Sequence, residues 1–275
     1  AIMSGLRSYA MYGPQNPFNN ELTDAELEAL KAEDLIAVLH DLANYKHRIL
    51  YYGPKTATEI ASNLKTVHPS PAQFKDLPAE KKFVQIDQNV NSVLFANYDM
   101  VQAEVFWIRN SEKYNAANAP TISMFNEYFG GGMGSIVFQT MRESKALAYS
   151  TYSAVSAASR KENRNSVMAY IGTQSDKFSD AVVGMNELLN ELPQSEKALE
   201  NGKEGLRKSL ATDRITQDGI LFSYLGAERL GLDYDLRKNT YDQSTKFTFA
   251  DLKAFHDKEM KAKPYSYCIV ANETR

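Results

Sequence analysis

The order of apolar patterns after residue 82 is the feature that most restricts the fold of this chain. Strand-like runs rich in Val, Ile, Phe and Trp come first, two helical stretches then flank a glycine run, and a further strand pair precedes a long helical region and one last strand. This order predicts an α+β layered sandwich, in which helices pack on a mainly antiparallel sheet. The expected strands are 83–87, 92–98, 101–108, 149–157, 167–173 and 265–271, the first three as antiparallel neighbours, and the later helices are 181–192, 196–212, 219–230 and 249–260.

The first 82 residues carry a separate, mostly helical pattern. Thr23 and Glu26 have the spacing of a capping box, so a helix is expected to begin there, with an apolar stripe from Leu27 to Leu42 that is interrupted near residues 32–34. Residues 48–52 are expected to form a strand, followed by a helix that contains Ile60 and Leu64. Because residues 68–82 combine loop-forming residues and charge without periodicity, we predict a linker and a domain boundary at about residue 82.

Composition places the chain among ordinary globular proteins and excludes several partners. It has 275 residues, 43% hydrophobic and 24% charged, with no apolar run that reaches the roughly 18 residues of a membrane-spanning helix. The formal net charge is −3, so no overall field attracts nucleic acid or an anionic membrane. Cys268 is the single cysteine and lies in an apolar run, which predicts a buried thiol. Since the chain starts without Met, we expect a piece processed or cut from a longer product.

The histidines do not have the spacing of a zinc site. The four are His40, His47, His68 and His256, and no two are four residues apart on one helix. Neither His-x-x-Glu-His nor His-Glu-x-x-His occurs. His40 and His47 lack a carboxylate between them at metal-ligand spacing, so we predict a surface position for them and no metal site in this chain.

A glycine run at Gly130–Gly134 joins two expected helices. It lacks the Gly-Lys-Ser/Thr of a phosphate-binding loop and does not follow a strand. We therefore expect a helix that ends through left-handed glycines, with Ser135 capping the next helix, which runs to about Lys145. Neither Ser135 nor Ser150 has a base nearby in the sequence, so no Ser-His-Asp arrangement is predicted.

Arg142 and Tyr149 form the most informative pair of polar residues. They lie seven residues apart, where a helix end leads into a strand. A guanidinium and a phenol that meet at a cleft can hold a peptide carbonyl and stabilise an oxyanion. The spacing also suits an Arg that interacts with a helix C-terminus and an ordinary strand Tyr, so the residues alone leave both interpretations open.

The segment from Phe129 to Ser150 resembles the M16 family of zinc metallopeptidases, the pitrilysin, insulin-degrading enzyme and mitochondrial processing peptidase type. The resemblance consists of a glycine-rich turn, an aliphatic-Phe helix, Arg142-Glu143, and Leu147-Ala148-Tyr149-Ser150 entering a strand. It implies the LuxS/MPP-like fold of that family. In M16 proteins two similar halves enclose a peptide, and only one half carries the inverted zinc motif.

By this resemblance the chain is similar to the C-terminal, non-zinc half, with residues 83–275 as its M16-like domain and residues 1–82 as the end of a preceding M16-like domain plus linker. The resemblance implies that Arg142 and Tyr149 contact the substrate and its oxyanion, with Tyr152, Gly130, Gly131 and Gly132 as further substrate-binding candidates. No cofactor is expected in this chain, and zinc is expected in a partner half, in the same polypeptide or a separate subunit. The expected substrate is a peptide or unfolded polypeptide.

The chain alone is expected to be inactive, because the metal and the general base that activate the attacking water would belong to the other half. Two alternatives stay open at this stage: a catalytically inactive M16-like structural or peptide-binding subunit, and a separate α+β domain whose residues 130–134 bind an anion. The residues do not identify a compartment; for a bacterial member, the periplasm or cell envelope is the expectation.

Overall fold

The computed structural model describes residues 1–274, which form two compact units. The first unit, which we call the sheet unit, contains residues 1–19, 83–214 and the chain from residue 226 onward. The second, which we call the helical unit, contains residues 20–82 and 215–225. Residue 82 is thus the last residue of the first segment of the helical unit, whereas residues 1–19 belong to the sheet unit. That residues 1–82 are the end of a preceding domain stays a prediction.

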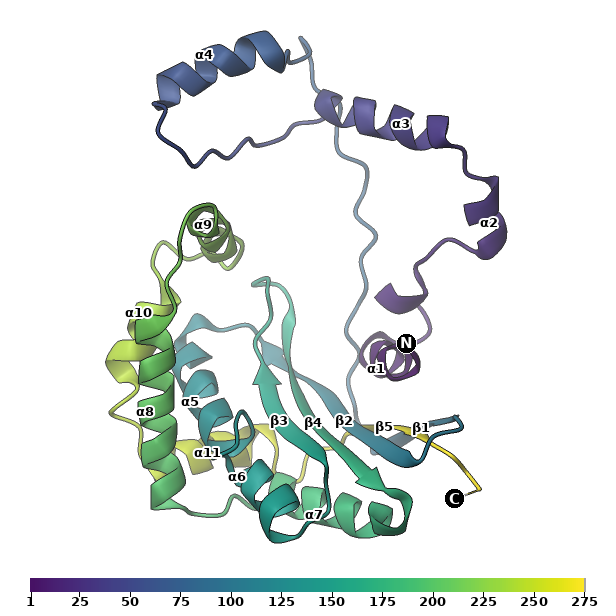
Figure 1. Cartoon of the computed structure of the whole chain (residues 1–275), viewed down its shortest axis with the longest axis vertical. Helices are drawn as coiled ribbons and strands as arrows, with labels where there is room; N and C mark the ends of the chain where they lie inside the picture. Colours follow the sequence, from purple (N-terminus) through teal and green to yellow (C-terminus); the bar gives the residue numbers. More distant parts are fainter. Residues whose placement is uncertain (275) are drawn as a thin grey trace. The chain divides into compact units, whose positions relative to one another are not determined.

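A five-stranded sheet organises the sheet unit and confirms the predicted α+β class (Figure 1). Its order is β1-β5-β2-β4-β3, and all neighbours are antiparallel except β1 and β5. The strand bounds are β1 Ser92–Asn97, β2 Gln102–Lys113, β3 Ser150–Ser156, β4 Arg164–Gln174 and β5 Ser266–Ala271. The strands predicted at 92–98 and 101–108 exist, yet the prediction that they are neighbours is wrong, because β5 lies between them.

Helices cover one face of the sheet and build the main core. The helices that contribute buried side chains there are α5 (Ala119–Phe129), α6 (Ile136–Phe138), α7 (Phe178–Asn190), α8 (Glu196–Thr212) and α11 (Phe249–Glu259). They pack on the odd-numbered residues of β2, such as Val105 and Trp107, as the alternation of a strand requires. The remaining helices after β4 are α9 (Gly219–Arg229) and α10 (Leu236–Gln243), of which α10 is not predicted by the sequence.

The opposite face of the sheet carries a smaller core under α1 (Ile2–Tyr12), a second helix that is not among the expected elements. Ala10 of α1 packs there with Phe106, Ile108 and Cys268. Cys268 is fully buried, as predicted, and burial raises the pKa of its thiol to about 12. No helix within residues 1–274 combines the length and apolar character needed to cross a membrane.

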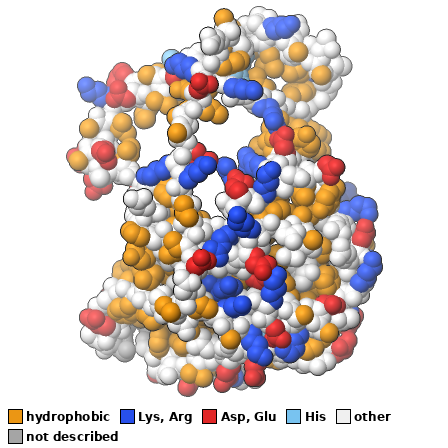
Figure 2. All heavy atoms as spheres, turned by 180° about the vertical axis from the view of Figure 1, so that it is seen from behind, with side chains coloured by type: hydrophobic (Ala, Val, Ile, Leu, Met, Phe, Trp, Pro, Cys, Tyr) orange, Lys and Arg blue, Asp and Glu red, His pale blue; other side chains and the backbone are white. Residues whose placement is uncertain are grey.

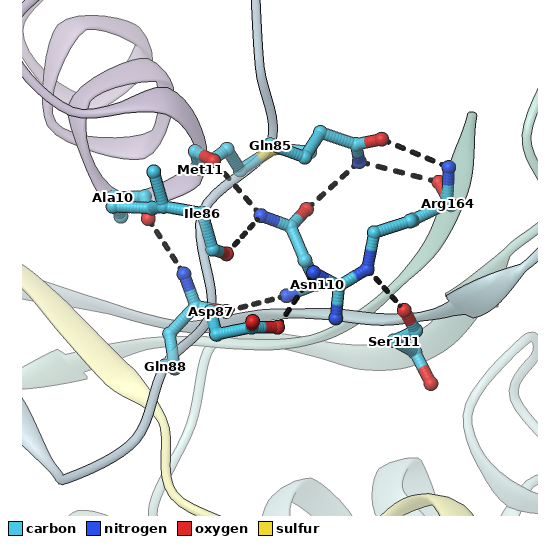
Figure 3. Close-up of polar contacts among 9 residues, drawn as sticks. All are labelled: Ala10, Met11, Gln85, Ile86, Asp87, Gln88, Asn110, Ser111 and Arg164. Atoms are coloured by element: carbon cyan, nitrogen blue, oxygen red, sulfur yellow. Dashed lines mark hydrogen bonds and ion pairs between the residues drawn. The ribbon is translucent and has the colours of Figure 1, made fainter. Parts of the chain in front are cut away.

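Residues 83–87 are not a strand, which corrects the prediction, because side-chain amides replace the backbone ladder. Figure 3 shows Asn110 at the centre of this network. Its Nδ2 donates to the carbonyl oxygens of Met11 (2.8 Å) and Ile86 (2.9 Å), and its Oδ1 accepts from Gln85 Nε2 (2.9 Å). Gln88 bridges the Asn110 amide to the carbonyl of Ala10 (2.7 Å each).

Arg164 completes the same network by donating to Asp87 Oδ1 and to the Ser111 carbonyl, at 2.6 Å each. The C-terminal end of α1 and residues 85–88 are therefore both tied to β2 and β4.

The helical unit contains α2 (Asp24–Ala29), α3 (Ala32–Asp41) and α4 (Ala57–Val67). The capping box at Thr23 and Glu26 forms as predicted, and a second one at Thr56 starts α4. None of residues 20–82 is buried, and hydrophobic side chains lie on the surface of these helices (Figure 2). The predicted strand at 48–52 does not form, since these residues pair with no strand within the described chain.

Candidate functional site

Arg142 lies on an irregular helical turn that the local sequence sets up. Ser135 caps α6, with its Oγ accepting from the Phe138 amide (3.4 Å), as predicted. The helix then widens to a π-helix over Gln139–Ser144, where the Lys145 amide donates to the carbonyl of Thr140 (2.9 Å). Ala146 follows with a positive φ of 50°, which is unfavourable for a residue with a Cβ. Widened turns and strained residues of this kind are frequent at functional sites.

The strained turn brings Arg142 and Tyr149 together. The Arg142 guanidinium carbon lies 5.6 Å from the centre of the Tyr149 ring and 5.0 Å from that of Phe138. The Arg142 side chain is 43% exposed and Tyr149 is 74% exposed, so both can reach a ligand. Glu143 is the nearest carboxylate to Arg142, with 3.8 Å between Oε1 and Nε, a weak pairing for two solvated side chains. Two hydrogen-bond donors are therefore available side by side.

A polar pocket lies beside Tyr149. The backbone of Ala146 and Tyr149 shapes it, because Lys177 Nζ donates to the Ala146 carbonyl (2.9 Å) and the Tyr149 amide donates to the Gly172 carbonyl (3.0 Å). Among the described residues, the lining contains no Asp or Glu. Its side chains are those of Gln102, Leu147, Tyr149, Gln174 and Lys177, with Ala146 and Ala148. A surface with donors and a lysine but no carboxylate suits a ligand with carbonyl or anionic oxygens.

Gly130 and Gly131 have packing reasons to be glycine. Gly130 lies against β3, where its carbonyl accepts from the Ser153 amide (3.3 Å), and a Cβ at this position would come within 2.2 Å of the Ser153 oxygen. A Cβ at Gly131 would lie 2.8 Å from the Asn126 carbonyl oxygen. The predicted left-handed helix end is wrong, because Gly130 has a φ of −142° and, within residues 1–274, only Gly13 and Gly231 are glycines with positive φ.

Gly132 is different, since a Cβ there would meet no atom within 4 Å. The space beside its Cα is therefore open, and its carbonyl accepts a hydrogen bond from Ser135 Oγ (2.6 Å). Substrate contacts by Gly130, Gly131 and Gly132 stay predictions.

Tyr152 lies on β3 opposite Tyr170 of β4. The two rings stack with 5.3 Å between their centres and 28° between their planes. Tyr152 is 38% exposed, and burial raises the pKa of its hydroxyl, an effect that the charge of Arg7 partly opposes. Its ring also contacts Phe106, over which Arg7 of α1 lies, and the sequence could not relate Arg7 to Tyr152 because 145 residues separate them.

The histidines do not form a zinc site. His47 and His68, which are 21 residues apart in the sequence, meet with 2.8 Å between their Nε2 atoms, a contact that spacing rules cannot reveal. His256 is fully buried and its Nε2 contacts the Leu188 carbonyl oxygen at 2.9 Å. Within residues 1–274 no three His, Cys, Asp or Glu side chains are grouped to hold a metal ion. The residues of this chain therefore do not fit the zinc that the M16 resemblance implies for a complete enzyme.

The comparison with protein families gives a match over more than half of the chain. The family described as peptidase M16 inactive domain matches residues 55–206, which include the glycine run, Arg142, Tyr149 and Tyr152. No curated protein matches the chain in sequence.

Solved structures agree with this fold. A peptidase M16 inactive domain from Pseudomonas fluorescens is 17% identical with a TM-score of 0.69, and the match covers 98% of this chain and 65% of that one. A conserved protein from Enterococcus faecalis is 16% identical with a TM-score of 0.72, over 99% and 64% of the two chains. The ferredoxin protease FusC, solved in complex with Arabidopsis ferredoxin, is 13% identical with a TM-score of 0.68, over 96% and 29%.

This chain thus spans less than two thirds of the length of these relatives. Since the family match and the fold agree, the chain belongs to the M16 peptidase family, as its inactive domain type.

Proposed function

We propose that this chain is the non-zinc half of an M16-type metalloendopeptidase, which binds peptide substrate and completes the active site of a zinc-carrying half. The observation that carries the proposal is the exposed pair of Arg142 and Tyr149 on a strained turn. A turn that is costly to form and that presents two donors to solvent is better explained by a ligand than by stability.

The residues of this chain would act by holding a carbonyl oxygen. The Arg142 guanidinium is permanently charged and the Tyr149 hydroxyl is a neutral donor, so both can donate to a peptide carbonyl and more strongly to an oxyanion. Such donors accelerate acyl transfer when they are fixed before the reaction starts. Phe138, against which the guanidinium lies, and the π-helical turn limit the positions that Arg142 can adopt. The hydrolytic metal and base would come from the other half, because the described residues of this chain contain no metal cluster.

The helical unit would pack against another M16 domain, in the same polypeptide or in a partner subunit. Its support is the set of apolar side chains that the described chain leaves uncovered, including the strand-like run at residues 48–52. The larger exposed members are Leu27, Leu35, Ile36, Val38, Leu39, Leu42, Ile49, Leu50, Tyr51 and Tyr52. Exposed apolar surface of this extent is typical of a surface that a partner covers.

Binding of short fluorescent peptides tests the proposal without requiring turnover. We expect Arg142→Ala and Tyr149→Phe each to weaken binding of a polar, extended peptide, by about tenfold for the arginine and less for the tyrosine. Tyr98→Phe is the matched control, because Tyr98 is also an exposed tyrosine of the sheet unit. Equal affinities in all four proteins would contradict the proposal.

Turnover distinguishes the enzyme half from an inactive subunit. With the zinc-carrying half that co-purifies with this chain, Arg142→Ala is expected to lower kcat/KM while leaving the circular dichroism spectrum unchanged. Peptide binding without turnover in the reconstituted pair would favour the inactive peptide-binding subunit instead.

A further inference from the structure

The sheet face on which α1 packs carries a second Arg–Tyr pair, Arg7 of α1 and Tyr152 of β3. Tyr152, Tyr170, Phe106 and Cys268 form one row across β3, β4, β2 and β5. Tyr152 and Tyr170 stack, and each also contacts the Phe106 ring, with centres 6.5 and 6.3 Å apart. This row is an aromatic floor whose outer member, Tyr152, is exposed to solvent.

Arg7 of α1 lies over this floor without a partner for its charge. Its guanidinium carbon is 4.1 Å from the centre of the Phe106 ring, and its Nε is buried without a hydrogen-bond acceptor. Among residues 1–274, no carboxylate forms an ion pair with Arg7. Cation–π contact offsets only part of the cost of removing a guanidinium from water, so a half-buried arginine without an acceptor calls for a ligand.

The Tyr152 hydroxyl is a second donor near Arg7. It has no hydrogen-bond partner in the described part of the chain, and its ring contacts the same Phe106 ring over which the Arg7 guanidinium lies. Glu104 lies in the next row of the sheet, opposite Gly172, and its charge acts instead on the Tyr170 hydroxyl, whose pKa burial and this carboxylate raise to about 12. The Arg7 charge therefore lies over the row of Phe106, and the Glu104 charge lies in the neighbouring row.

We propose that Arg7 and Tyr152 form a carboxylate-binding subsite for a peptide that extends from Arg142 and Tyr149. The inference rests on the proposed peptide-binding function and names the chemistry of its substrate. Charge complementarity selects the occupant, because Arg7 and Tyr152 are two donors without an acceptor of their own, while the Glu104 carboxylate acts on Tyr170, and such a donor pair matches a carboxylate carried on a peptide. Tyr149 and Tyr152 are three residues apart, about 10 Å in an extended chain, and side chains at this spacing point to opposite faces of a sheet. Because β3 is an edge strand, a peptide that runs along it presents alternate side chains to the two faces and can reach both pairs.

Three fluorescein-labelled peptides of otherwise identical polar sequence provide the test with the full chain. The first has one internal Glu and an amidated C-terminus, the second has Gln in that place and is amidated, and the third has Gln and a free C-terminal carboxylate. Anisotropy titrations at low and high salt give the affinities. A preference of about tenfold for the first or the third peptide over the second is expected, and which of the two is favoured identifies the source of the carboxylate.

Variants assign that preference to residues. Arg7→Met should abolish it, Tyr152→Phe should reduce it, and Tyr98→Phe should preserve it. If Arg7→Met does not fold by circular dichroism, Tyr152→Phe decides the result. Equal binding of all three peptides, or a preference that both variants retain, would overturn the carboxylate subsite alone, while loss of all binding in Arg142→Ala would still support the proposed function. No binding of any peptide to the unchanged chain would overturn both.

Discussion

The sheet unit and the helical unit have similar amphipathic patterns but opposite outcomes. In the sheet unit, apolar side chains from β2, β3 and β4 and from several helices meet in a buried core, against which two side chains of β5 also pack. In the helical unit, α3 and α4 carry comparable apolar stripes, yet none of residues 20–82 is buried. An apolar stripe therefore identifies a helix, but burial requires a second apolar surface, which the sheet unit contains and residues 20–82 do not supply.

The largest expected effect comes from a core deletion in the sheet unit. Trp107 is fully buried and its Nε1 donates to Asn186 Oδ1 (2.9 Å), so Trp107→Ala should lower the free energy of unfolding by about 3–5 kcal/mol. Leu39→Ala in the helical unit should change it by less than about 0.5 kcal/mol, because Leu39 is 64% exposed. Urea titrations measure both, and similar losses would mean that the two units do not differ in packing.

The amide network tests whether residues 85–88 and α1 are held by polar contacts. Asn110→Leu leaves the Met11 and Ile86 carbonyls without their donor and should cost about 2–3 kcal/mol of unfolding free energy. Hydrogen exchange should also increase at the C-terminal end of α1 and around Ile86. Asn201→Leu on the exposed face of α8 is the control. An unchanged exchange pattern in Asn110→Leu would show that the network is not what holds these segments.

Acid should destabilise the sheet unit through His256. Burial, the largest cause, lowers the pKa of this imidazole below its ordinary value of 6.5, and the Asp257 carboxylate, 3.6 Å from Nδ1 and beyond hydrogen-bond distance, opposes this only in part. The unfolded chain therefore binds a proton that the folded chain resists, so the unfolding free energy should fall as the pH drops below about 6.5. His256→Gln should flatten this slope, whereas the exposed His40→Gln in the helical unit should not. A slope that is the same in all three proteins would exclude this origin.

The smallest effect compares two capping boxes that differ only in the acidic residue, Asp251 in one and Glu59 in the other. Thr248 caps α11, which packs on the main core, and Thr56 caps α4 in the helical unit; both accept from the amide three residues later at 3.3 Å. Thr248→Ala should lower the unfolding free energy by about 1 kcal/mol, while Thr56→Ala should fray α4 without moving the main transition. Equal shifts of the urea midpoint would indicate that the two units unfold together.

Local signals predict most helices and strands here, and long-range contacts account for the errors. The capping boxes and the amphipathic stretches of α4, α7 and α8 are visible in the sequence because their signals lie within a few residues. Residues 83–87 have a strand composition but are held by Gln85, Gln88 and Asn110, which lie on different segments. Residues 48–52 read as a strand, and no strand of the described chain pairs with them.

In the candidate site, too, residues that are close in the chain can be predicted from the sequence, and residues that are distant in the chain cannot. The motif around Arg142 and Tyr149 is contiguous, so the sequence identifies the pair, but only the π-helical turn and the positive φ of Ala146 explain how seven residues bring them into contact. Arg7 is 145 residues from Tyr152, so nothing local relates the two, although the apolar spacing of Met3, Leu6 and Ala10 is a helical signal for α1 itself.

The α+β class, the M16 resemblance, the absence of a zinc motif and the Arg–Tyr pair can all be inferred from the sequence, because each depends on residues that are close in the chain. Only long-range contacts account for the parallel pairing of β1 with β5, the packing of α1 on the second sheet face and the position of Arg7 over Phe106. These features depend on which surfaces meet across distant parts of the chain, and that choice is made by burial of apolar area and by satisfied polar groups rather than by local pattern.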